Sequence, residues 1–500
     1  LKRMPVRAKA GLAILALLAV LAAAALLLRG KPPAPMPQAA YVGAAACAGC
    51  HAAQAQAWSG SQHAHAMQPA APQTVLGDFG DARFGGSLFH RDGERWLVRA
   101  EGRDGKAADF EVKYTFGLYP LQQYLVPFAD GRMQALNLAW DARPAAQGGQ
   151  RWFDRQGGGR LAPDDALHWT QAAQNWNYMC AGCHSTHLQR NYDAAQDRYH
   201  TTWSDLAVGC ESCHGPGSNH LAWARRAPGS ETWPDQGLAI ALDERHGAHW
   251  ARDAADLPQR SAALHSHREV ETCAACHARA RPLGLSADPT GHLLDTHDPS
   301  LLDAGLYYPD GQQQAEVYIY SSFLQSRMYA EGVSCSDCHE PHGARLRAQG
   351  NALCAQCHDA ARYDQPAHTL HAAGGSGAQC VACHMPERTY MQVDARRDHS
   401  LRIPRPDLSL RYGTPNACDA CHADKGAAWA ADALQRAFGP PKDGTQHFAA
   451  ALSAARSGAP GAYEQLLALA ADTTSPGIAR ATAVTALGAW PNGDTWQLLR

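Results

Sequence analysis

The chain has 500 residues, a formal net charge of −3, 18% charged residues, 45 glycines and 30 prolines. This length allows about three ordinary domains, but strongly apolar residues are spread thinly for so long a chain. The negative net charge argues against nucleic acid as a partner, because phosphate backbones are bound by basic surfaces.

The N-terminal segment predicts export. Four basic residues within the first nine positions precede an unbroken apolar run over residues 11–28, which is just long enough to cross a bilayer. No clean cleavage site follows it. We therefore expect residues 1–28 to be a signal anchor in the inner membrane, with a cleaved signal peptide as the alternative. Residues 29–40 are proline-rich and predict a stiff tether to a periplasmic region.

One pattern, Cys-x-x-Cys-His, occurs eight times and uses all sixteen cysteines. In chain order, motifs 1 to 8 are Cys47-Cys50-His51, Cys180-Cys183-His184, Cys210-Cys213-His214, Cys273-Cys276-His277, Cys335-Cys338-His339, Cys354-Cys357-His358, Cys380-Cys383-His384 and Cys418-Cys421-His422. Two sulfurs at this spacing reach the two vinyl groups of one porphyrin, and the histidine lies under the iron as its axial ligand. The motifs therefore predict eight covalent haems c.

Zinc ribbons and disulfide frameworks also contain CxxC pairs, but they do not explain the histidines. Histidine is 26 of 500 residues, so its chance occurrence after all eight pairs has odds on the order of 10⁻¹⁰. Propionates on eight ferric haems would take the net charge to roughly −11. Arginine supplies most of the positive charge, and its planar fork suits propionate pairing.

The histidines outside the motifs are candidate sixth ligands of the irons. Two neutral imidazoles give a low-potential haem suited to electron transfer. We expect sixth ligands at His63, His168, His220, His342, His371 and His399, with His65, His297 and His368 as second choices. His246, His249, His265, His267 and His447 are expected to be surface or structural residues.

Between motifs 1 and 2 the pattern changes to alternating apolar and polar residues. The turn signals RDGE (91–94), RDGK (103–106) and ADGR (129–132) separate these runs. They predict a β-rich insertion over about residues 75–158. Covering the first haem is its simpler role, and docking a partner is the alternative.

After motif 8, residues 424–500 form alanine- and leucine-rich segments broken by glycine- and proline-containing turns. They predict the start of an α-solenoid of HEAT or tetratricopeptide type, incomplete in this chain, which could dock proteins. The alternative is a short helical cap on the haem region.

Several stretches resemble known multihaem cytochromes. The segment VGCESCHGPGSNH (208–220) resembles the family of the tetrahaem electron acceptor of hydroxylamine oxidoreductase. The segments around motifs 5, 7 and 8 resemble a larger bacterial group in which such a haem region is fused to tetratricopeptide or HEAT-like repeats. The likeness covers about residues 41–440, but eight sites and a β-rich insertion depart from the compact tetrahaem domain.

The sequence thus predicts a mainly α chain with an octahaem cytochrome c domain of little regular structure over residues 41–423, interrupted by the β-rich insertion. The expected function is a periplasmic relay that passes electrons between redox protein partners. An octahaem oxidoreductase acting on nitrite, hydroxylamine or tetrathionate stays open as the alternative. The resemblance marks no catalytic residue, and the lysine that replaces a motif histidine in some nitrite reductases is absent.

Overall fold

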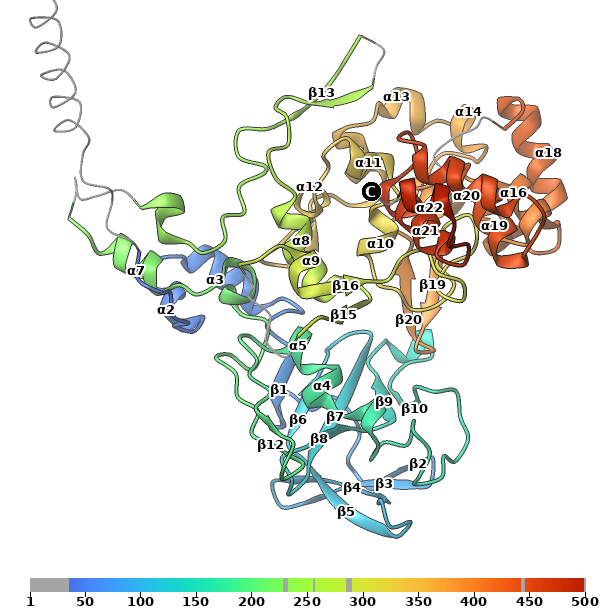
Figure 1. The fold of residues 1–500 in the computed structure, drawn as a ribbon. Helices are drawn as coiled ribbons and strands as arrows, with labels where there is room; N and C mark the ends of the chain where they lie inside the picture. Colours follow the sequence, from blue (N-terminus) through green and yellow to red (C-terminus); the bar gives the residue numbers. More distant parts are fainter. Residues whose placement is uncertain (1–35, 228–232, 255–256, 285–289, 442–445, 499–500) are drawn as a thin grey trace, which may run out of the picture. The chain divides into compact units, whose positions relative to one another are not determined.

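The computed structural model describes residues 36–227, 233–254, 257–284, 290–441 and 446–498 (Figure 1). These residues divide into two compact units, one of residues 36–40 and 216–239 and the other of residues 41–215 and 240–498. All eight motifs lie in the larger unit. The expected anchor over residues 11–28 lies outside the described residues, and none of the described helices is long and apolar enough to cross a membrane.

The smaller unit is built on helix α7 (Ser218–Ala224) and the 3₁₀ turn η3 (Pro234–Gly237). Asn219 Nδ2 donates a hydrogen bond of 2.8 Å to the Pro37 carbonyl, and the Ala40 N–H donates to Ser218 Oγ at 2.8 Å. These bonds tie the chain before motif 1 to helix α7.

Ten strands between Met67 and Asp154 form two antiparallel sheets, and all of them except β1 lie within residues 75–158, where the sequence predicts the β-rich insertion. The first sheet has the order β1-β6-β7-β9-β10, with β8 also on β7, and the second is a β2-β3-β4-β5 meander. The strands are β1 (Met67–Pro69), β2 (Ala82–Phe84), β3 (Ser87–Asp92), β4 (Arg95–Glu101), β5 (Ala107–Val112), β6 (Tyr114–Phe116), β7 (Leu121–Pro127), β8 (Met133–Ala135), β9 (Leu138–Asp141) and β10 (Arg151–Asp154).

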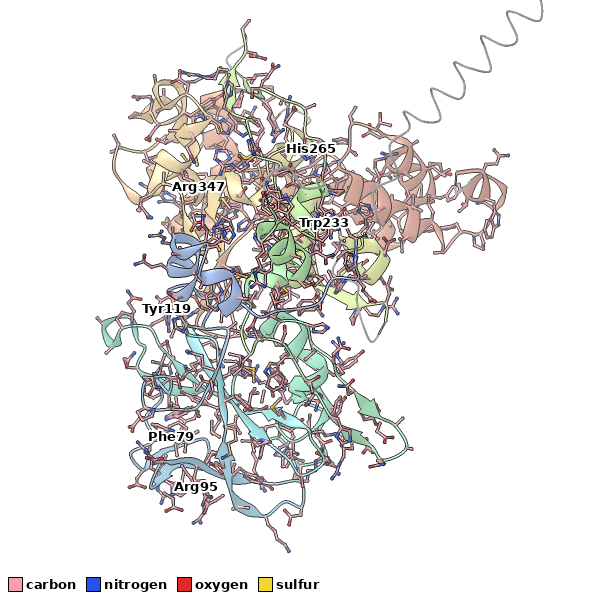
Figure 2. The ribbon with its side chains drawn as sticks, turned by 90° about the vertical axis from the view of Figure 1, so that its left-hand side faces the viewer. Phe79, Arg95, Tyr119, Trp233, His265 and Arg347 are labelled. Atoms are coloured by element: carbon pink, nitrogen blue, oxygen red, sulfur yellow. The ribbon has the colours of Figure 1, made fainter. Side chains whose placement is uncertain are left out.

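An aromatic cluster forms the core of this region. Phe79, labelled in Figure 2, is buried and meets the rings of Phe89, Trp96, Tyr124 and Trp152 edge to face. Such edge-to-face contacts match the positive edge of one ring with the negative face of another. The region thus has an apolar core of its own, made without any motif residue.

The turns of this region follow the sequence signals. Gly93, Gly105 and Gly131 all adopt positive φ, at 58°, 75° and 79°. Because glycine has no Cβ, it enters this left-handed region at little cost. The three Asp-Gly pairs therefore end strands β3, β4 and β7 at the turns that the sequence predicts.

The rest of the haem-motif region consists of short elements. Each motif overlaps a helix or 3₁₀ turn, namely α2 (Ala45–Ala48), α5 (Ala181–His184), α6 (Cys210–His214), α8 (Arg268–His277), α12 (Cys335–Cys338), η4 (Gly350–Gln356), α15 (Cys380–His384) and α17 (Asp419–His422). Between them lie α3 (Ala52–Ser59), η1 (Ala145–Gln147), η2 (Ala172–Gln174), α4 (Trp176–Met179), α9 (Leu293–Thr296), α10 (Tyr320–Phe323), α11 (Arg327–Ala330), α13 (Ala360–Tyr363), α14 (Pro366–Thr369), η5 (Ser376–Ala378) and α16 (Pro406–Tyr412).

Two-stranded antiparallel pairs connect these helices. They are β11 (Tyr192–Asp193) with β12 (Arg198–Tyr199), β13 (Trp250–Arg252) with β14 (Pro258–Arg260), β15 (Ala280–Pro282) with β16 (His297–Pro299), β17 (His339–Glu340) with β18 (Arg345–Leu346), and β19 (Glu387–Tyr390) with β20 (Asp394–Arg397). Helix makes up 33% and strand 19% of the residues that the structure describes. Helix is thus the commoner element, but the expected "mainly α" description gives too little weight to the strands. The two- to four-residue strands of these pairs are too short to show an alternating apolar and polar pattern in the sequence.

The C-terminal segment is helical and consists of α18 (Gly426–Phe438), α19 (Ala449–Ser457), α20 (Ala462–Ala471), α21 (Gly477–Leu487) and α22 (Gly493–Leu498). Consecutive helices α19, α20 and α21 pack on one another (Figure 1). Their buried residues share one core with Leu302, Tyr307 and Val317, which precede motif 5. Arg456 on α19 donates to the carbonyls of Leu302 and Tyr307 at 2.6 and 2.8 Å. These helices therefore cover part of the haem-motif region, and their continuation as a solenoid stays a prediction.

Candidate haem-binding sites

The CxxCH spacing fits a helical turn. The motif histidine N–H bonds to the carbonyl of the first cysteine at 3.0 Å in motif 1, 2.9 Å in motif 6 and 2.8 Å in motif 8. Residues three apart on such a turn point to the same side. Each motif thus presents its two thiols together, as attachment to one porphyrin requires.

The two alternative uses of the cysteines find no support in the geometry. All sixteen thiols are free rather than joined in disulfides. Within the described ranges, no three Cys, His, Asp or Glu side chains converge as a metal site would need. A structural zinc site requires four such ligands around one point.

Four motif histidines each face a histidine from outside the motifs. The pairs are His277 with His63, His339 with His399, His384 with His368 and His422 with His371, with ring centroids 6.2, 6.5, 6.1 and 6.1 Å apart. An iron–nitrogen bond is about 2.0 Å long and a ring centre lies about 1 Å behind its nitrogen, so imidazoles on opposite sides of one iron have centroids about 6 Å apart. The four pairs fit this requirement.

Backbone carbonyls fix the tautomer of several of these rings. Nδ1 contacts a carbonyl oxygen at 2.8 Å in His384 (Arg402), 2.9 Å in His399 (Arg397) and 2.6 Å in His371 (Thr369). A carbonyl can only accept, so Nδ1 carries the proton in the neutral ring. Nε2 then keeps its lone pair, which is the atom a metal needs. His184 of motif 2 makes the same contact with the Ala66 carbonyl at 3.0 Å.

Burial keeps several of the rings neutral. It lowers the pKa of His277 to about 4, with His63 as the next cause, because a charged ring loses hydration in the interior. Burial also lowers the pKa of His63 and of His399. These imidazoles are therefore in their metal-binding form at neutral pH without help from a cofactor.

Thiols of different motifs lie beside one another. In four pairs one thiol lies close enough to shift the pKa of the other, namely Cys47 with Cys210, Cys183 with Cys276, Cys273 with Cys335, and Cys354 with Cys380. In three further pairs a cysteine of a neighbouring motif helps to raise the pKa of the thiol, namely Cys273 for Cys213, Cys357 for Cys338, and Cys418 for Cys383. The motifs thus form a continuous order 1-3-4-5-6-7-8, and motif 2 joins this order at motif 4.

A hollow of about 340 Å³ opens at motif 6. It is lined by Trp250 and Arg252 of β13 and by Cys357, His358 and Asp359. Arg252 Nη1 lies 3.2 Å from Asp359 Oδ2, so the β13–β14 pair is tied to the residue that follows this motif. The hollow leaves space beside the motif thiol and histidine for part of a porphyrin.

The other expected sixth ligands have different surroundings. His168 is buried with Nδ1 2.9 Å from Thr170 Oγ1, and His342 Nδ1 lies 3.1 Å from Glu340 Oε1. His220 lies in the smaller unit, stacked on Trp223 with Nδ1 3.0 Å from the Gln236 carbonyl. In the part of the chain that the structure describes, neither His168 nor His342 has a ring contact with a motif histidine, so their assignment stays a prediction.

The second choices also differ from one another. His368 faces His384 and so has the geometry expected of the first choices. His65 has its Nδ1 buried without a hydrogen-bond partner, and His297 Nδ1 lies 2.8 Å from Thr296 Oγ1. Of the expected surface residues, His265 pairs with Asp243 at 3.1 Å and His447 with Asp472 at 2.7 Å. Only contacts from the folded chain favour His368 over His342, since His342 follows its motif more closely.

Comparison with known proteins agrees with the motif assignment. The family model "Doubled CXXCH motif" matches residues 328–363, which hold motifs 5 and 6. The model "Cytochrome c554 and c-prime" matches residues 46–76 and 160–215, which hold motifs 1 to 3. No curated protein matched. A solved structure described as outer cell wall cytochrome OcwA is similar, with a TM-score of 0.50 and 18% identity over 92% of this chain and 100% of that one.

The motif matches, the shared fold and the facing histidines define the class of this protein. The chain is a multihaem c-type cytochrome that binds haem c through CxxCH motifs.

Proposed function

We propose that the chain is an electron-transfer relay that carries eight covalent haems c outside the cytoplasm. The single observation that carries this proposal is the set of four facing histidine pairs, because two strong imidazole ligands leave an iron no open position for a substrate. Covalently bound haem would supply one-electron redox chemistry, and the motif cysteines and histidines described above would attach and orient it.

The neighbouring thiols support a continuous path. The order 1-3-4-5-6-7-8 places the ends of the path at motifs 1 and 8, and motif 2 forms a side branch at motif 4. Cys276 and Cys273 of motif 4 each contact a different motif, so this site has more neighbours than any other described motif. A relay needs such continuity, whereas an isolated binding site does not.

The location and the partners rest on general arguments. Haem c is attached outside the cytoplasm, and the solved cytochrome of similar fold is described as an outer cell wall protein. The apolar run over residues 11–28 supports export or an inner-membrane anchor. The partners would be redox proteins, with the C-terminal helices available as a docking element.

A second candidate function rests on two motif histidines. Among the described residues, His184 and His358 face no second histidine, and their ring contacts are to Phe116 at 5.4 Å and Tyr363 at 5.8 Å. An iron without a second strong ligand can bind a small molecule. This observation favours an oxidoreductase acting on a small nitrogen or sulfur compound as the alternative.

The two functions are separated by turnover. The fully reduced protein is mixed in turn with nitrite, hydroxylamine and tetrathionate, and its absorption spectrum is followed. A relay gives no sustained reoxidation by these compounds. Multiple-turnover reoxidation that cyanide abolishes at a high-spin haem would replace the relay by the oxidoreductase.

A further inference from the structure

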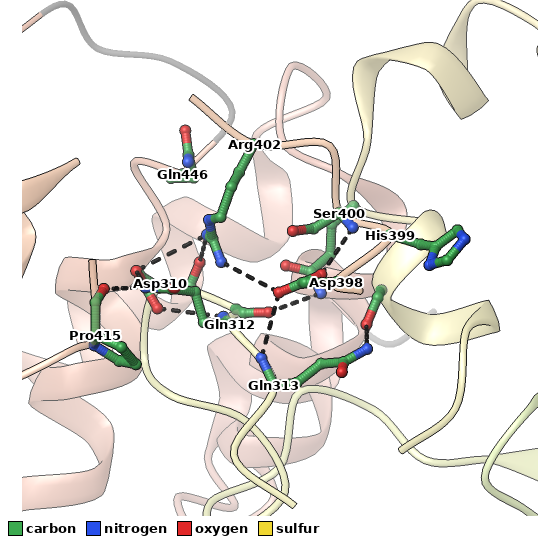
Figure 3. Close-up of polar contacts among 12 residues, drawn as sticks. Asp310, Gln312, Gln313, Asp398, His399, Ser400, Arg402, Pro415 and Gln446 are labelled. Carbon is green, nitrogen blue, oxygen red and sulfur yellow. Dashed lines mark hydrogen bonds and ion pairs between the residues drawn. The ribbon is translucent and has the colours of Figure 1, made fainter. Parts of the chain in front are cut away.

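One buried arginine, Arg402, contacts residues that position histidines at two motif sites. Arg402 is 6% exposed and lies between two buried carboxylates, with Nη2 3.8 Å from Asp310 Oδ2 and Nη1 3.8 Å from Asp398 Oδ2. Nη2 also donates to the Asp310 carbonyl at 2.6 Å. Figure 3 shows Arg402 extending between the two aspartates, with the His399 ring pointing away from the ion pairs.

The backbone of Arg402 holds the motif 7 histidine. Its carbonyl accepts from His384 Nδ1 at 2.8 Å, and its N–H donates to the His384 carbonyl at 3.1 Å. This two-way contact fixes both the tautomer and the orientation of the His384 ring, which faces His368.

The side chain of Arg402 restrains the residues that carry the histidine facing motif 5. Asp398, its ion-pair partner, directly precedes His399, whose ring lies 6.5 Å from that of His339. Asp398 is itself fixed by the Ser400 N–H at 2.8 Å, and its own N–H donates to the Pro386 carbonyl at 3.0 Å. The segment 398–402 therefore reaches both sites as one connected piece of backbone.

This segment needs an anchor, because Leu401 adopts a φ of +48°. A non-glycine residue in the left-handed region is strained and persists only where its surroundings hold it. The buried ion pairs on either side of Arg402 supply that hold, since an unpaired buried carboxylate is strongly unfavourable.

We propose that Arg402 is a positioning residue for two haem sites at once, setting His384 through its backbone and His399 through its ion pair with Asp398. This inference rests on the proposed haem ligation. It requires that a change at one side chain, which itself contacts no iron ligand, alters the coordination at motifs 5 and 7 together.

The test compares Arg402→Met with a matched control in the β-rich region. Arg143→Met also removes an ion pair from a buried carboxylate, since Arg143 bonds the fully buried Asp141 at 2.7 and 2.9 Å, and leaves it only Arg151 Nε at 3.8 Å. Haem content is measured by intact mass, and the irons by paramagnetic resonance and redox titration. We expect Arg402→Met to keep every haem but to change two low-spin signals and their midpoint potentials, and Arg143→Met to change none.

Two further variants keep the test decisive. Asp398→Asn keeps the Ser400 contact at Oδ1 and breaks the ion pair together with the long 3.5 Å contact from the Gln313 N–H, so it should change the signal of the His339–His399 site most. Arg402→Lys keeps the positive charge but lacks the planar guanidinium group. It should therefore accumulate as folded protein even if Arg402→Met does not, with a smaller change in the low-spin signals of the same two sites.

Unchanged signals and potentials in the variants that accumulate, with only a lower melting temperature, would overturn the positioning role. A wild-type protein without low-spin signals would instead overturn the ligation on which the inference depends.

Discussion

His63 and His277 are 214 positions apart in the sequence, yet their rings face one another with centroids 6.2 Å apart. The first follows motif 1 and the second belongs to motif 4. If both rings bind one iron, as we propose, the N-terminal part of the chain completes a site whose cysteines lie in helix α8. We expect the other three facing pairs to work in the same way.

Replacing His63 should change one iron only. His63→Ala removes one of two strong ligands, so we expect one low-spin haem to become high-spin while the haem number stays the same. His90→Ala is the control, since His90 lies in strand β3 and its Nε2 is 3.1 Å from Asp109 Oδ1. Paramagnetic resonance with intact mass measures both effects, and equal spectra for the two variants would refute the assignment.

Removing a motif should have effects that depend on its place in the order. The variants Cys273→Ala/Cys276→Ala at motif 4 and Cys418→Ala/Cys421→Ala at motif 8 should each lose one haem by mass. Because motif 4 joins three neighbours and motif 8 lies at an end, only the first variant should split rapid internal electron equilibration into two phases. Stopped-flow reduction measures this, and indistinguishable kinetics would contradict the proposed order.

The C-terminal helices should depend on the haem-motif region for their stability. Leu302 is fully buried in the core that it shares with Leu466 and Leu487. Leu302→Ala leaves a cavity there and should destabilise the helices by about 2–5 kcal/mol. Limited proteolysis at increasing urea concentration measures this destabilisation. If helices α19–α21 resist proteolysis equally in the variant and the wild type, they form an independent repeat.

We expect a fall in pH to destabilise helices α19–α21 through protonation of Asp472. Hydrogen bonds from Thr474 first, and from His447 and Ser475 next, lower the pKa of Asp472 below its usual range. A carboxyl whose folded-state pKa is lowered stabilises the fold above its unfolded pKa of about 3.9, and this contribution is lost as the pH falls through the folded-state value. Asp472→Asn should therefore flatten the decline of stability below about pH 4, measured by circular dichroism. The exposed Asp432→Asn is the control, and an equal slope in both would contradict this role.

The motifs could be predicted from sequence because their geometry is local. Attachment to one porphyrin fixes the spacing of Cys and His within five residues, and the Asp-Gly turns of the β-rich region are equally local. The facing pairs depend on the folded chain. Position in the sequence favours His342, which follows its motif more closely than His368 does, whereas the fold brings His368 to His384 and His342 to Glu340.

Residues without a motif could not be recognised at all. Arg402 has no sequence signature, and its importance comes from the carbonyl contact with His384 and the two buried aspartates. Likewise, the apolar pattern after motif 8 predicts helices, but it cannot show that their core includes Leu302 and Tyr307.

The spin state of the irons in the oxidised, purified holoprotein tests the central claim most directly. If the four facing pairs each hold one iron, quantitative paramagnetic resonance should show at least four low-spin ferric haems per chain, with any high-spin signal confined to sites such as motifs 2 and 6. Fewer than four low-spin haems per chain would contradict the proposed ligation and the relay that rests on it.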